Sequence, residues 1–150
     1  MRKIVLILVT ITMITSCGYR AMYSNKNFNF EVIKIEKIKQ DKLNLKIEKR
    51  IKNFSNNNAI NKISLQIDAE KKIIITSKDA KGDASRYQMI VKLNLKIIDN
   101  QNNKVNKNIV QQFSYNTNSN KFALNQYEIE IEEILINKII DELIKNLSKL

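Results

Sequence analysis

Residues 86–97 read Arg-Tyr-Gln-Met-Ile-Val-Lys-Leu-Asn-Leu-Lys-Ile, and apolar side chains alternate with polar ones through most of this stretch. Successive side chains of a β-strand point to opposite faces of a sheet, so the pattern predicts a long strand. One face carries Tyr87, Met89, Val91, Leu93, Leu95 and Ile97, and the other carries Arg86, Gln88, Lys92, Asn94 and Lys96. The strand therefore belongs to a sheet with one covered face and one face in water.

The same alternation predicts strands before and after this one. Residues 63–75 form a strand with an irregularity near Glu70-Lys71-Lys72, and residues 109–115 form another. Polar turns at 79–83 and 99–104 join these strands in series, which favours antiparallel pairing. An earlier strand is predicted over residues 30–38, where Ile33 and Ile35 alternate with lysine and glutamate.

Two segments have the spacing of amphipathic helices. Asp41 can cap a helix over residues 42–54, whose apolar face consists of Leu43, Ile47, Ile51 and Phe54. A longer helix is predicted over residues 124–147. Its apolar side consists of Ile129, Ile131, Ile134, Leu135, Ile136, Ile139, Ile140, Leu143, Ile144 and Leu147.

The element order β-α-β-β-β-α predicts an α+β fold. We expect one two-layer domain over residues 30–150, a four-stranded mainly antiparallel sheet with both helices on one face. The helix between the first two strands leaves room for a parallel pairing there. The other sheet face is exposed or given to a partner.

The first 16 residues have the features of an export signal. Arg2 and Lys3 precede a run of Ile, Val, Leu, Met and Thr that ends at Ile14, and Ile14-Thr15-Ser16-Cys17 matches the site where a lipoprotein is cleaved and its cysteine acylated. As a helix this run is about 17 Å long, short of the roughly 30 Å of a bilayer core. The alternative is an ordinary signal peptide in which Cys17 occurs by chance.

These features divide the chain into a signal peptide at 1–16, a lipidated N-terminus and tether at 17–29, and the folded domain. Cys17 is the predicted lipidation site. Gly18 follows it in place of the aspartate that retains many lipoproteins in the inner membrane, so we expect delivery to the outer membrane. The domain would then lie on the periplasmic side of that membrane or inside a barrel lumen.

The composition argues against catalysis. The chain has no His and one Cys, which leaves no Ser-His or Cys-His pair and no usual metal site. Its two glycines cannot make a glycine-rich phosphate loop. The acidic cluster Glu128, Glu130, Glu132 and Glu133 is interpreted as the solvated face of the last helix. We expect no enzyme, no cofactor and no metal.

The charge suits an anionic partner. Cleavage before Cys17 would remove two of the 26 basic residues and leave 24 against 15 acidic ones. Phosphorylated lipid, a membrane surface and nucleic acid all fit this excess, but export excludes nucleic acid. The alternative is that the many Lys, Asn and Ile residues reflect an AT-rich genome.

Three stretches resemble the LPS-assembly lipoprotein family (LptE) in its alphaproteobacterial form. They are Cys17-Gly18-Tyr19-Arg20-Ala21-Met22-Tyr23, Ala84-Ser85-Arg86-Tyr87-Gln88-Met89, and Ser114-Tyr115-Asn116 with Ser119-Asn120-Lys121-Phe122-Ala123 after it. Ala21 stands where the family usually has Pro, and the last helix has Ile and Glu where relatives often have Ala and Arg.

The resemblance implies a lipoprotein that plugs the outer-membrane β-barrel LptD, helps it assemble and assists delivery of lipopolysaccharide to the outer leaflet. Lipopolysaccharide carries phosphates that basic side chains can bind. The candidate residues are Arg86 first, then Lys81, Lys92 and Lys96.

Two other functions stay open. One is a lipoprotein that acts as a scaffold in general barrel assembly or envelope integrity, for which depletion would first cause broad barrel defects. The other is a carrier of a soluble ligand or an exported hydrolase, which requires a deep apolar pocket beneath the helices or paired carboxylates in a cleft.

Overall fold

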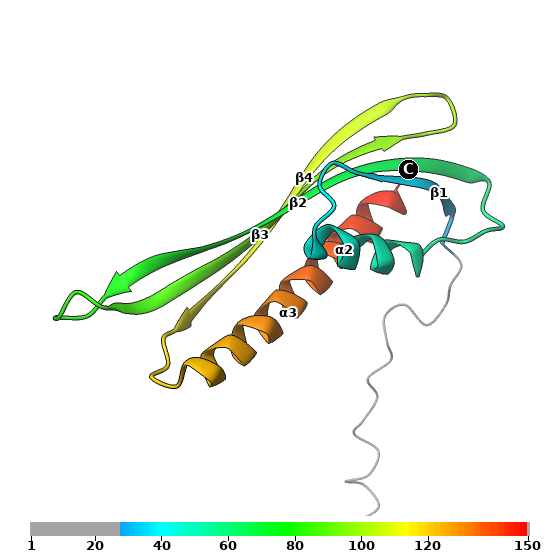
Figure 1. Cartoon of the computed structure of the whole chain (residues 1–150). Helices are drawn as coiled ribbons and strands as arrows, with labels where there is room; N and C mark the ends of the chain where they lie inside the picture. The colour runs from blue at the N-terminus through cyan, green and yellow to red at the C-terminus, as the bar shows by residue number, and fades with distance from the viewer. Residues whose placement is uncertain (1–27, 150) are drawn as a thin grey trace, which may run out of the picture.

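The computed structural model describes residues 28–149 (Figure 1). The elements are β1 (Phe30–Lys37), α2 (Lys42–Lys52), β2 (Asn61–Lys78), β3 (Ala84–Ile98), β4 (Lys104–Asn116) and α3 (Lys121–Leu147). The predicted signal peptide, Cys17 and most of the tether lie outside the described residues. Within the described range, no helix is both long and apolar enough to cross a membrane.

The four strands form one sheet in the order β1-β2-β3-β4. β1 is parallel to β2, and the other two pairings are antiparallel. Both helices lie on the same side of the sheet, α2 against β1 and β2, and α3 against β3 and β4 (Figure 1). The α+β prediction, its element order and its two layers are confirmed.

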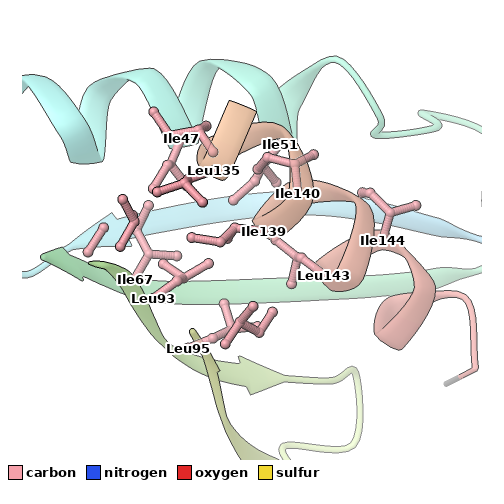
Figure 2. Close-up of a cluster of buried hydrophobic side chains, with 14 of the residues drawn as sticks. Ile47, Ile51, Ile67, Leu93, Leu95, Leu135, Ile139, Ile140, Leu143 and Ile144 are labelled. Atoms are coloured by element: carbon pink, nitrogen blue, oxygen red, sulfur yellow. The ribbon is translucent and has the colours of Figure 1, made fainter. Parts of the chain in front are cut away.

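The core lies between the helices and the sheet. Ile67, Leu93 and Leu95 of the sheet face Ile139 and Leu143 of α3, and residues of α2 close the side of the cluster (Figure 2). All of the apolar residues predicted to point inward from β3 are buried except Tyr87, which is partly exposed. The alternation in residues 86–97 therefore identified the covered face of the sheet.

β2 is one continuous strand, which corrects the irregularity predicted near Glu70-Lys71-Lys72. The register with β3 is unbroken through these residues and shifts only between Ile75 and Lys78. The three charged side chains interrupt the apolar pattern without interrupting the backbone ladder. Two of them form ion pairs with residues outside the sheet: Glu70 pairs with Lys39, and Lys71 pairs with Glu132 of α3.

The predicted alternation in β1 is wrong at Ile33. The pairing of β1 with β2 shifts between Val32 and Lys34, so that Val32 and Ile35 pack against the core while Ile33 is 57% exposed. A β-bulge adds one residue to a strand and changes the face of every residue after it. The sequence of β1 contains no Gly or Asp that would have indicated the bulge.

α3 begins at Lys121, three residues earlier than predicted, because Asn120 caps it. The Asn120 side chain accepts hydrogen bonds from the N–H groups of Phe122 and Ala123. Two residues assigned to the apolar side, Ile129 and Ile134, are each 46% exposed. The other eight are buried.

A buried asparagine attaches α2 to β2. Asn44 accepts the N–H of Ala69 at 2.8 Å and donates to the carbonyl oxygen of Ala69 at 3.2 Å. The side chain is fully buried, and Asp41, which caps α2 as predicted, also accepts from it. β1 pairs with β2 only as far as Ile67. Two residues further on, at Ala69, the side chain of Asn44 makes the hydrogen bonds that a neighbouring strand would otherwise make.

Candidate interaction surface

The face of the sheet opposite the helices is uncovered and mostly polar. On β3 and β4 it consists of Arg86, Gln88, Ile90, Lys92, Asn94, Lys96 and Ile98, and of Lys104, Asn106, Asn108, Val110, Gln112, Ser114 and Asn116. We call this set the outer face. In Figure 1 both described helices lie on the other side of the sheet, so the outer face extends along the long strands. Its polarity follows from the alternation that buries the opposite side chains.

Two of the stretches that carry the family resemblance meet in this sheet. Residues 86–88 of β3 pair with residues 114–116 of β4. Arg86 is opposite Asn116 on the outer face, and its Nε donates to the Asn116 side-chain oxygen at 3.3 Å. Tyr87 is opposite Tyr115 on the covered face, with ring centroids 5.7 Å apart in a stacked arrangement. Residues 28 and 30 positions apart thus form one local unit.

Tyr115 also connects β4 to α3. Its hydroxyl donates to Glu128 at 2.6 Å, and its ring has an edge-on contact with Tyr127. Burial raises the pKa of Tyr115, and the hydrogen bond to the Glu128 carboxylate raises it further. The alternation in residues 109–115 places Tyr115 on the same face as Ile109, but nothing in the local pattern places Glu128 beside it.

The other predicted lipid-binding cations are spread along the hairpin and the sheet. Lys92 and Lys96 lie on the outer face, roughly 20 Å and 33 Å along β3 from Arg86 at about 3.3 Å per residue. Lys81 lies in the turn between β2 and β3, where Asp79 accepts its backbone N–H at 2.9 Å. The structure therefore brings three of the four candidates to one face without gathering them into one pocket.

These four cations differ from those near the helices. In the described part of the chain, none of the four forms an ion pair with a carboxylate. Lys92 is opposite Glu70, whose pKa is lowered chiefly by its hydrogen bond from Lys39 and to a smaller extent by the charge of Lys92. Charges on the outer face of β3 are consequently available to an anion.

Two of the four α3 acids predicted to form a solvated face, Glu132 and Glu133, instead tie the helices together, whereas Glu130 is exposed as predicted. Lys46 of α2 lies 2.9 Å from Glu132 and 2.7 Å from Glu133, and Arg50 also contacts Glu133. Lys71 of β2 reaches Glu132 at 2.5 Å. Burial alone would raise the pKa of Glu132, but the hydrogen bonds from Lys71 and Lys46 outweigh it and lower the pKa. Sequence spacing gave no sign of this cluster.

A two-layer α+β domain with an uncovered polar sheet face is the class that these observations define. Among solved structures, the chain is similar to rare lipoprotein B from Shewanella oneidensis, with a TM-score of 0.60 and 12% identity over 79% of this chain and 94% of that chain. It is similar to a minor lipoprotein from Acinetobacter baumannii, with a TM-score of 0.58 and 15% identity over 81% and 92% of the two chains.

A third similar structure is that of an uncharacterized lipoprotein B from Nitrosomonas europaea, with a TM-score of 0.58 and 14% identity over 87% of this chain and 90% of that chain. The chain has the fold of these lipoproteins, and at the level of the fold this agrees with the resemblance found in the sequence. No model of a known protein family matches the sequence. A search of curated proteins also finds no match.

Proposed function

We propose that this protein is an outer-membrane lipoprotein, anchored through Cys17, that plugs an LptD-type β-barrel and helps it assemble and deliver lipopolysaccharide to the outer leaflet. The observation that carries the proposal is the outer face, a long polar sheet surface without a covering layer. The likeness to lipoproteins of the same fold supports the anchored form.

The outer face has the chemistry that the lumen of a large barrel requires. Such a lumen is polar, so a plug should present amide, hydroxyl and amino groups and not a broad apolar patch. Asn94 is opposite Asn108, Asn106 lies two residues from Asn108 on the same face of β4, and Gln88 and Ser114 are opposite each other further along. These groups can exchange hydrogen bonds with a polar barrel wall along the whole length of the sheet.

The phosphates of lipopolysaccharide fit the free cations of the same surface. Arg86 can bind a phosphate oxygen through guanidinium N–H groups while its Nε stays bonded to Asn116. Lys92 and Lys96 lie further along the strand, and Lys81 lies at the hairpin tip. Their spacing suits a row of separate contacts along an elongated lipid better than one enclosed site.

Co-purification with a large β-barrel after gentle detergent extraction tests the plug. We expect Ser114→Trp, which places a bulky ring on the outer face, to lose most of the barrel, because the sheet could no longer approach the wall. Ser148→Trp, beyond the end of α3, is the matched control and should retain it. Recovery of the wild type only as a free lipidated monomer would contradict the proposal.

Removal of the free cations tests the lipid contacts. The triple variant Arg86→Gln, Lys92→Gln, Lys96→Gln should bind purified lipopolysaccharide roughly tenfold more weakly, since each charge-assisted bond to phosphate is lost. The control removes the same charge from α3 and its end through Lys138→Gln, Lys145→Gln and Lys149→Gln. Equal losses in the two variants would show that only net charge matters. Dephosphorylated lipopolysaccharide should bind all three proteins alike.

A further inference from the structure

The distal part of β2 is an open sheet edge. β1 pairs with β2 only as far as Ile67, and Asn44 then bonds both backbone groups of Ala69. β2 continues to Lys78 with β3 on its other side. Figure 1 shows the β2–β3 hairpin projecting well beyond the end of β1 and beyond α2. Within residues 28–149, no strand pairs with this edge after Ala69.

The backbone groups that point to this edge can be assigned from Ala69. Alternate residues of a strand direct their N–H and C=O groups to the same side. Ala69 directs both toward Asn44, away from β3, so Lys71, Ile73 and Ile75 direct theirs to the same open edge. Next to the start of the edge, an open hollow of about 740 Å³ bordered by Lys39, Lys42 and Glu70 leaves room for an approaching strand.

Apolar side chains lie on both faces of the sheet along this edge. Ile73 and Ile75, on the helix side of the sheet, are 38% and 52% exposed, and Ile74 lies between them on the outer side. Open strands in soluble proteins are normally short, charged or covered, because an exposed apolar edge is a template for another strand. Here lysines stand only at the ends of the isoleucine run.

We propose that a second copy of this chain occupies the edge, with its own β2 antiparallel and a two-fold axis through Ile74. In this register Ile73 of each copy is opposite Ile75 of the other, and these are the residues whose backbone groups point to the edge. Beyond these pairs each strand reaches the register shift that follows Ile75 of the other copy, so the regular part of the ladder is the isoleucine run.

Charge selects this register over its neighbours. A pairing in which the two copies share a continuous sheet face can shift only in steps that keep each residue on its face. A shift in one direction takes Ile73 past the register shift that follows Ile75 of the second copy, and a shift in the other places Ile75 opposite Lys71. Only the register centred on Ile74 matches every isoleucine with an isoleucine and no lysine with a lysine. The opposite edge of the sheet, β4, has no comparable apolar run.

A symmetric disulfide tests the register in the full chain purified in detergent. Ile74→Cys should form a crosslinked dimer on mild oxidation, because the two introduced side chains face each other across the axis. Thr76→Cys is the control. In the proposed dimer the two substituted positions would be four residues out of register, roughly 13 Å apart along the strands, and should not crosslink. The wild type reports any crosslink through Cys17.

A second pair of variants tests the association itself by dilution in analytical ultracentrifugation. Ile74→Lys should weaken the dimer roughly tenfold or more, since two lysines would then face each other at its centre. Val110→Lys, the same change on the outer face of β4, should leave it unaltered. A strictly monomeric wild type, equal crosslinking of both cysteine variants, or crosslinking of Ile74→Cys only to a different protein would overturn the proposal. The proposed barrel plug can succeed or fail independently, because no barrel is present in these measurements.

Discussion

Replacement of Cys17 by Ala is expected to prevent acylation, and so to abolish delivery to the outer membrane and recovery with a barrel. Acyl chains contribute about 0.8 kcal/mol for each buried methylene, so the several chains of a lipoprotein cysteine hold the domain permanently at the bilayer. The domain itself should fold normally, because Cys17 precedes β1 by more than ten residues.

Metabolic labelling with a palmitate analogue measures this effect, with membrane fractionation as the second readout. The wild type should take up label and fractionate with the outer membrane, and Cys17→Ala should do neither. Ser16→Ala is the matched control, because it keeps a small residue before the cysteine and should be labelled like the wild type. Absence of label from the wild type would contradict the lipoprotein assignment and with it the proposed function.

Asn44→Leu is expected to lower the free energy of unfolding by about 2–4 kcal/mol, the cost of leaving buried backbone groups without hydrogen bonds. Leucine has a similar size, so the change removes hydrogen bonds without opening a large cavity. Both the N–H and the carbonyl of Ala69 would lose their partner at a site where Asn44 and Ala69 are almost completely buried. The variant would also lengthen the open edge of β2.

Urea unfolding of the purified protein, followed by circular dichroism, measures this change in stability. Asn125→Leu makes the same replacement on an exposed position of α3 and should change the stability by less than about 0.5 kcal/mol. Equal effects of the two variants would show that the amide of Asn44 does not hold β2. A larger effect of Asn44→Leu with an unchanged urea slope would support the assignment.

Periodicity predicted the elements whose surroundings are regular. The alternation in residues 86–97 indicated both faces of β3, and the spacing from Leu43 to Phe54 indicated the face of α2 that packs on the sheet. The predictions failed where tertiary contacts override local pattern. Ile33 is displaced by a bulge, and Ile129 is 46% exposed although it was assigned to the apolar side of its helix.

The candidate surface was predicted in part. The polar alternation of β3 and β4 indicated an uncovered face with Arg86, Lys92 and Lys96, and the structure places these residues there. The pairing of Arg86 with Asn116 and of Tyr87 with Tyr115 could not be predicted, because it depends on the register between two strands. The ion pairs of Glu132 depend on how closely three elements approach.

The sequence by itself determined which segments are helices and strands and which sheet face is buried, because these properties depend on the order and period of neighbouring residues. It also predicts an export signal with a cysteine at its end. The tertiary structure alone decided that Asn44 replaces β1 as the hydrogen-bonding partner of β2 at Ala69, and that residues 86–88 and 114–116 form one unit. It also decided that the isoleucines of β2 lie at an open edge. Each of these depends on the register and reach of segments far apart in the chain, which local periodicity does not encode.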